Sequence, residues 1–152
     1  MKKILCACSI GGHLTEMLRI IEALELPEKP LYITYNGNAE NVLKEAYFIG
    51  NMGKIRNIPW GLIKILVILL KERPKVVIST GAENGMFAIF ISKVFLRSKT
   101  IYIECSAQVN NPSISGRVCY YFSDLFFVQW RPLLNCYGKR AKYGGNLIFG
   151  NL

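Results

Sequence analysis

The chain has 152 residues, of which 51% are hydrophobic and 19% are charged, so it is apolar enough for one domain with a buried core and too apolar for a disordered chain. Its formal net charge of +9 predicts an anionic partner, which is a phosphorylated ligand, an acidic lipid surface or a nucleic acid. No apolar run reaches the roughly 20 residues of a membrane-spanning helix, and the five cysteines form no CxxC pair. We expect a single domain over residues 1–152, with reduced thiols.

The first unit of the chain reads as strand, glycine loop and helix. Residues 3–8 form an apolar run typical of a buried strand, and residues 13–24 have apolar side chains at helical spacing. The loop between them has neither the GxGxxG pattern nor a P-loop lysine. Paired glycines before a helix let backbone N–H groups approach an anion closely. The pattern predicts a phosphate site at Ser9, Gly11, Gly12 and Thr15.

The next elements continue the alternation of strands and helices. A second strand is expected at 31–35, followed by a less regular stretch over 39–57 with a short helix and a short strand. Pro59 opens a strongly apolar helix over residues 60–73, and Pro74 ends it. A third clear strand follows at 75–79.

Strands and helices also alternate in the second half of the chain. After a loop at 80–85, the expected elements are a helix at 86–96, a strand at 100–104, a short helix at 116–122, a strand at 125–128, a weak helix at 131–137 and a last strand at 146–149. Strands that are continuously apolar and alternate with helices indicate a parallel sheet covered on both faces. The predicted fold class is α/β, a Rossmann-like parallel sheet with helices on both faces.

His13, the single histidine, follows the first strand at the point where the loop becomes a helix. Ligands of open α/β sheets bind at the carboxyl ends of the strands, and an imidazole there is a candidate general base. A plain helix-capping role is the alternative. A zinc site of Cys6, Cys8 and His13 is disfavoured, because strand alternation turns both cysteines toward the core. We therefore predict no metal.

Several polar residues also follow strands and are expected at the same edge of the sheet. Carboxylates and amides bind sugar hydroxyls, although such residues often satisfy loop backbone groups instead. The carboxylate Glu104 is one candidate. The others predicted to bind a ligand here are Gly81, Glu83, Asn84 and Ser106.

The helix over residues 60–73 combines an apolar body with an aromatic residue at its start and basic residues along one face. An interfacial membrane helix has this composition. Burial against another subunit is the alternative. The residues predicted to contact a membrane are Trp60, Lys64, Lys71 and, after the helix at 86–96, Arg97.

Four short motifs occur in order along the chain: Ser-Ile-Gly-Gly-His-Leu-Thr-Glu-Met-Leu at 9–18, Ser-Thr-Gly at 79–81, Ile-Glu-Cys-Ser at 103–106 and Phe-Val-Gln-Trp at 127–130. Together they resemble the Alg-fourteen (asparagine-linked glycosylation protein fourteen) family over nearly the whole chain. The family loop commonly has a third small residue where this chain has Ile10. The glycine loop is also similar to the Gly-Gly-His loop of the peptidoglycan lipid-intermediate transferases.

The resemblance implies the N-terminal half of a GT-B glycosyltransferase that works in bacterial capsule or exopolysaccharide synthesis and is inactive or weakly active alone. A separate donor-binding subunit would supply the UDP-sugar, with no cofactor held by this chain. The acceptor would be a sugar on a polyprenyl diphosphate, held by the backbone of Gly11 and Gly12. His13 would accept the proton of the attacking hydroxyl, and Glu104 would position His13 or the acceptor sugar.

The resemblance also implies a peripheral position on the cytoplasmic face of the plasma membrane. Eukaryotic family members carry an N-terminal membrane anchor, whereas this sequence starts at its first strand, so the apolar helices or other proteins are expected to provide attachment. Two rival functions stay open. One is a self-sufficient Rossmann-type enzyme that binds a nucleotide at the glycine loop. The other is a basic nucleic-acid-binding module, which is disfavoured because the positive charges are spread along the chain and no nucleic-acid motif is present.

Overall fold

The computed structural model describes residues 4–147, and its strands form one sheet in which every neighbouring pair is parallel. The strand order is β3-β2-β1-β4-β5-β6-β7. The strands are β1 (Ile4–Ala7), β2 (Leu31–Tyr35), β3 (Ala46–Ile49), β4 (Val76–Ser79), β5 (Lys99–Ile103), β6 (Leu125–Val128) and β7 (Ala141–Tyr143). The predicted α/β class is confirmed.

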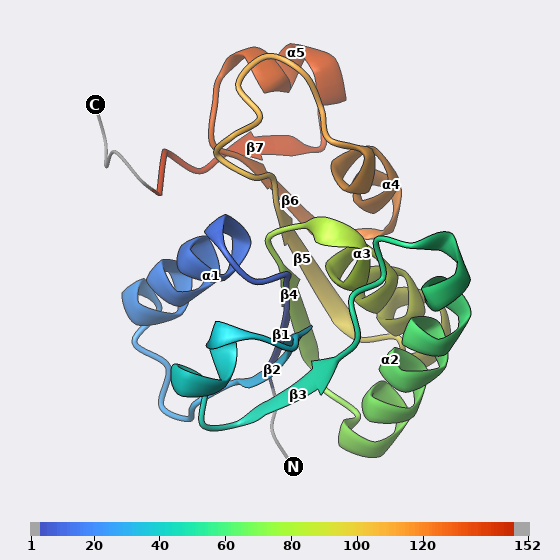
Figure 1. Ribbon diagram of the computed structural model, residues 1–152. Coiled ribbons are helices and arrows are strands. Elements are labelled where there is room, and N and C mark those ends of the chain that lie inside the picture. The colour runs from blue at the N-terminus through green and yellow to red at the C-terminus, as the bar shows by residue number, and fades with distance from the viewer. Residues whose placement is uncertain (1–3, 148–152) are drawn as a thin grey trace.

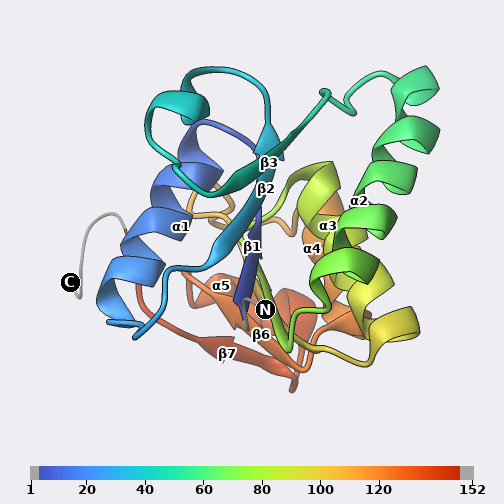
Figure 2. The same ribbon diagram turned by 90° about the horizontal axis from the view of Figure 1, so that it is seen from below.

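Helices cover both faces of this sheet, with α1 on one face and α2, α3 and α4 on the other (Figures 1 and 2). The α-helices are α1 (Gly12–Ala23), α2 (Ile58–Glu72), α3 (Ala82–Ile91), α4 (Ile114–Phe122) and α5 (Pro132–Tyr137). Two 3₁₀ turns, η1 (Asn38–Asn41) and η2 (Ile55–Asn57), and a π-helical turn, η3 (Ser92–Leu96), complete the elements.

Strand alternation divides the core into two layers. Leu5 and Ala7 of β1 pack with Ile65 of α2 and Ile89 of α3 on one face. Cys6 of β1 and Cys8, just after this strand, pack on the other face with residues of α1 such as Met17. Both cysteines are therefore core residues, as their spacing predicts. Burial raises the pKa of the Cys8 thiol to about 12, so it stays protonated.

The order of the strands creates a switch point between β1 and β4. The chain runs outward from β1 through β2 to β3, and then returns to lay β4 on the opposite side of β1. Connections leaving β1 and β4 therefore diverge to opposite faces of the sheet, which opens a crevice at their carboxyl ends. The loop after β1 and the turn after β4 meet there, at the upper end of the sheet in Figure 1.

Several boundaries differ from the sequence prediction, most clearly those of α3 and of the last strand. The loop expected at 80–85 is shorter, because Gly81 turns the chain with a φ of 123° and α3 already begins at Ala82. The last observed strand is β7, whereas the strand expected at 146–149 extends beyond the described residues. Of the three residues of β7 only Ala141 is buried, so no apolar run marks this edge strand.

Candidate active site

His13 lies in the first turn of α1 and is held by the turn that follows β4. Its Nδ1 atom lies 2.7 Å from the carbonyl oxygen of Thr80, and the Thr80 hydroxyl donates to the His13 carbonyl oxygen at 2.8 Å. A carbonyl oxygen only accepts, so Nδ1 carries the hydrogen. The lone pair of the neutral ring is therefore on Nε2. This arrangement suits a general base, and it ties together two loops that are 67 residues apart.

Gly81 provides the space in which the imidazole sits. A Cβ atom built at Gly81 would lie 2.8 Å from Cε1 of His13, which is closer than real Cβ contacts allow. The φ of 123° at Gly81 also favours glycine. Gly81, which was predicted to bind a ligand, therefore leaves room for the ring of His13, and its contact with a ligand stays a prediction.

Glu16 is a site residue that the sequence analysis did not select. It lies one helical turn after His13 and is 1% exposed. Its carboxylate accepts a hydrogen bond from the backbone N–H of Ser106 at 3.0 Å, a short one from the Ser106 hydroxyl, and one from Nε2 of Gln129 at 3.2 Å. The signal was present in the sequence, because residues three apart share one face of a helix.

Cys105 completes this group from the loop after β5. A ring nitrogen of His13, a carboxylate oxygen of Glu16 and the sulfur of Cys105 all lie within 4.8 Å of one another. The Cys105 thiol donates to the Glu16 carboxylate at 3.7 Å. Burial, followed by the Glu16 charge, raises the pKa of this thiol to about 11, so at neutral pH it is a hydrogen-bond donor rather than a nucleophile.

The glycine loop beside His13 is open to a ligand. Gly11 has a φ of 83°, and Cβ atoms built at Gly11 and Gly12 would meet no atom of residues 4–147 within 4 Å. Gly11 is the N-cap residue of α1 and has no side chain to cap the first N–H groups. Thr15 and Ser9 stabilise the turn through their hydroxyls, which donate to the carbonyl oxygens of Gly11 and Ile10.

A cavity of about 470 Å³ opens at the same edge, between the first turns of α3 and α4. Glu83 and Gln108 offer polar groups to it, and the apolar part of its wall includes Met86 and Ile114. Glu83 also accepts a hydrogen bond from the Tyr35 hydroxyl at 3.0 Å, which fixes the direction of its carboxylate. A mixed wall of this kind suits a sugar, which has both hydroxyl groups and apolar faces.

Three predicted ligand-binding residues turn inward instead. Asn84 is fully buried, and its amide donates to the carbonyl oxygen of Cys8 at 2.7 Å and accepts from the N–H of Gly85. Ser106 is buried and holds Glu16, as described above. Glu104 is fully buried, and its carboxylate accepts hydrogen bonds from the Ser113 hydroxyl at 2.8 Å and from the Tyr137 hydroxyl. The side chain of Glu104 therefore fastens α4 and α5, and Glu16 takes the place beside His13.

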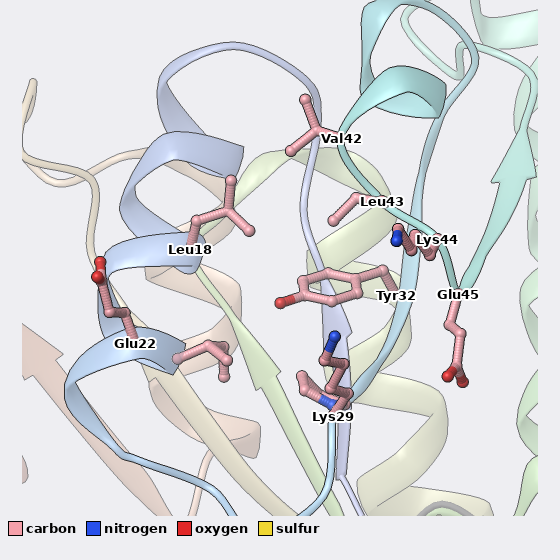
Figure 3. A pocket seen from close by; sticks show the side chains of 10 residues that line it. Leu18, Glu22, Lys29, Tyr32, Val42, Leu43, Lys44 and Glu45 are labelled. Atoms are coloured by element: carbon pink, nitrogen blue, oxygen red, sulfur yellow. The ribbon is translucent and has the colours of Figure 1, made fainter.

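A second cavity, of about 340 Å³, lies against the lower half of α1 (Figure 3). Leu18, Tyr32 and Leu43 form its apolar floor, and Lys29 and Lys44 lie at its border. It faces the amino ends of the strands, and none of the predicted site residues, all of which the structure describes, contributes to its wall. The carboxyl edge is therefore the better candidate for chemistry.

Helix α2 presents an exposed apolar stripe. Trp60 is 71% exposed and Val67 is 57% exposed, and Ile63 and Leu70 lie on the same stripe at intervals of three and four residues. Phe95 of η3 extends this apolar surface. The predicted contact residues Trp60, Lys64, Lys71 and Arg97 are all exposed. Within residues 4–147 no helix is both long enough and apolar enough to span a bilayer.

Comparison with known sequences identifies relatives of the chain. A family model described as "Oligosaccharide biosynthesis protein Alg14 like" matches residues 46–147, which is more than half of the chain. The UDP-N-acetylglucosamine transferase subunit ALG14 of Yarrowia lipolytica is 27% identical, in an alignment that covers 96% of this chain and 81% of the relative. Relatives with the same name occur in Candida albicans and Saccharomyces cerevisiae. These relatives are fungal, so they lend no support to the expected bacterial capsule or exopolysaccharide context.

Comparison with solved structures agrees with the fold. A Staphylococcus aureus MnaA structure with UDP superimposes with a TM-score of 0.75 at 13% identity, covering 97% of this chain and 46% of that one. Acinetobacter baumannii MurG superimposes with a TM-score of 0.70 at 12% identity, covering 86% and 42%. The chain thus spans less than half of each of these proteins. Its fold is that of one Rossmann-like half of a GT-B glycosyltransferase or a related epimerase.

Proposed function

Because the chain belongs to the Alg14-like family of oligosaccharide biosynthesis proteins, we propose that it is the acceptor-binding subunit of a two-component glycosyltransferase. A separate donor-binding subunit would hold the UDP-sugar above the carboxyl edge of the sheet. The relatives are named UDP-N-acetylglucosamine transferase subunits, which makes N-acetylglucosamine the proposed transferred sugar. The acceptor is a sugar on a polyprenyl diphosphate. That the product becomes part of a capsule or exopolysaccharide stays a prediction.

The observation that carries this proposal is the fixed tautomer of His13 at the switch point of the sheet. Nδ1 donates to the Thr80 carbonyl oxygen, so Nε2 is the proton acceptor. The open glycine loop lies beside it, and the cavity between α3 and α4 lies beyond Gly81. A base, an anion site and a sugar-sized cavity at one edge are what an acceptor half requires.

In the proposed mechanism, the diphosphate of the acceptor lies against Gly11, Gly12 and the first turn of α1, where backbone N–H groups and the helix dipole favour negative charge. The acceptor hydroxyl gives its proton to Nε2 of His13. Its oxygen forms a bond to the anomeric carbon of the donor as the bond from that carbon to the UDP oxygen breaks, which inverts the anomeric centre. The nearby Glu16 carboxylate stabilises the imidazolium that results.

Reconstitution with the partner tests this function. We expect no transfer from UDP-N-acetylglucosamine to a polyprenyl-diphosphate-linked sugar with this chain alone, and measurable transfer when a co-purifying donor-binding subunit is added. A radiolabelled donor and extraction of the lipid product provide the measurement. Binding of UDP-N-acetylglucosamine by the isolated chain, with turnover in the absence of any partner, would contradict the proposal and support a self-sufficient enzyme.

We further propose that the exposed stripe of α2 lies on a membrane surface, on the face of the sheet opposite α1 (Figure 2). Its apolar residues would enter the interface, and the exposed Lys64, Lys71 and Arg97 would contact acidic head groups. This orientation leaves the carboxyl edge free for the acceptor head group and for the partner.

Replacing Val67 with Asp should weaken binding to vesicles that contain acidic phospholipid by about tenfold or more, because a buried apolar side chain contributes about 1.5–3 kcal/mol and a charge at the interface opposes insertion. Vesicle sedimentation measures this binding. The matched control is Leu24→Asp, since Leu24 is 50% exposed at the end of α1 on the other face. Equal loss in both variants, or loss in neither, would exclude α2 as the contact surface.

A further inference from the structure

The group of His13, Glu16 and Cys105 has the composition of a transition-metal site. A ring nitrogen, a carboxylate oxygen and a thiol sulfur come within 4.8 Å of one another, from the first two turns of α1 and from the loop after β5. Imidazole nitrogen, carboxylate oxygen and thiolate sulfur are the ligand types that Zn²⁺ and its neighbours prefer.

The residues around this group already orient it. Nδ1 of His13 donates to the Thr80 carbonyl oxygen, which leaves Nε2 as the ring nitrogen able to bind a metal. Metal-binding histidines commonly donate their other N–H in this way, which fixes the tautomer and the ring orientation. The Glu16 carboxylate accepts hydrogen bonds from the Ser106 N–H and from Nε2 of Gln129, which fix its position. Such supporting hydrogen bonds raise affinity because the ligands need little reorganisation.

We propose that Nε2 of His13, the carboxylate of Glu16 and the sulfur of Cys105 bind one Zn²⁺-class ion, with the thiol proton released to solvent as the metal–sulfur bond forms and with a fourth position open toward the carboxyl edge of the sheet. His13 and Cys105 are half-buried, so an ion has access from that edge, whereas Glu16 is enclosed. Three protein ligands with an open fourth position differ from a closed structural site of four ligands.

The bound ion would occupy the lone pair with which His13 accepts a proton, so it would inhibit transfer. This consequence rests on the proposed function, but the metal site itself does not. Cys6 and Cys8 are enclosed in the core between the sheet and α1, so Cys105 is the thiol that can serve this site. The exposed Cys136 bonds to the Asn110 carbonyl oxygen at 3.5 Å and serves as a matched control.

Cobalt substitution tests the proposal on the isolated full-length chain. Titration with Co²⁺ should give one equivalent of binding and the thiolate-to-cobalt charge-transfer absorption of a bound sulfur. Competition with Zn²⁺ should then remove the cobalt spectrum. Cys105→Ser should abolish the charge-transfer band and weaken Zn²⁺ binding at least about tenfold. Cys136→Ser should leave both unchanged. Circular dichroism checks that each variant is folded.

A wild-type spectrum without the thiolate band, or the same band in Cys105→Ser, would overturn the metal site. His13→Gln gives a second readout, because losing the nitrogen ligand should change the d–d bands while the thiolate band persists. Inhibition of the reconstituted complex by Zn²⁺ is measured separately. Tight metal binding without inhibition would leave the metal site standing and would count against His13 as the base, so the two proposals fail in distinguishable ways.

Discussion

Replacing His13 with Gln should lower the turnover of the reconstituted transferase by about 10²–10⁴-fold, the usual contribution of a positioned general base. The Gln amide is able to donate to the Thr80 carbonyl oxygen as Nδ1 does, but it has no group that accepts a proton at neutral pH. His13→Ala should lose as much activity. Thermal unfolding should change little, because the imidazole is half-buried at the edge of the sheet.

The companion variant is Glu16→Gln, which keeps the shape of the side chain and removes its charge. If the carboxylate stabilises the imidazolium, turnover should fall by about tenfold while the KM for the acceptor stays near the wild-type value, because the charge acts on the ring of His13 when it has taken the proton. A merely structural Glu16 would leave the turnover of the folded variant in place. Wild-type turnover in His13→Gln would remove His13 from the chemistry and assign the base to the partner subunit.

Strands β1, β2 and β4 and the loop before α1 could be predicted because their signals are local: the strands are apolar runs, and Gly11 and Gly12 mark a turn just before a helix. Strand β7 was not predicted, because two of its three residues are exposed. Glu16 was harder to predict, because a carboxylate on an amphipathic helix is usually part of the solvent-exposed face. Its burial depends on Ser106 and Gln129, which lie 90 and 113 residues away in the sequence.

Asn84 shows the same limit. Its position after β4 suggested a ligand contact, but its amide donates to the carbonyl oxygen of Cys8, just after β1, and to that of Ile33 within β2. Buried backbone carbonyl groups such as that of Cys8 need a hydrogen-bond donor where the strand ends. The edge of the sheet therefore needs polar side chains for its own stability as well as for a ligand, and position alone does not separate the two uses.

Substitution of Glu104 tests whether a polar residue at this edge stabilises the fold or acts on a ligand. Its carboxylate is fully buried and accepts hydrogen bonds from Ser113, from the Tyr137 hydroxyl and, at 3.0 Å, from the N–H of Cys105. Burial, and then the hydrogen bond to Glu104 and its charge, raise the pKa of the Tyr137 phenol, so this phenol remains a donor throughout the neutral range. A Cβ built at Gly116 would collide with the same carboxylate, which shows how closely α4 approaches it.

Glu104→Ala should therefore lower the free energy of unfolding by about 3 kcal/mol or more, because each buried donor left without a partner costs about 1–3 kcal/mol. Urea unfolding followed by circular dichroism measures the change. The control is Glu83→Ala, which removes an exposed carboxylate that accepts a hydrogen bond from the Tyr35 hydroxyl, and it should cost less than about 1 kcal/mol. If Glu104→Ala were as stable as the wild type but inactive in transfer, the catalytic role first expected for Glu104 would be restored. Loss of stability with turnover retained by the folded fraction would establish that Glu104 fastens α4 and α5 to the sheet, and that His13 and Glu16 work without it.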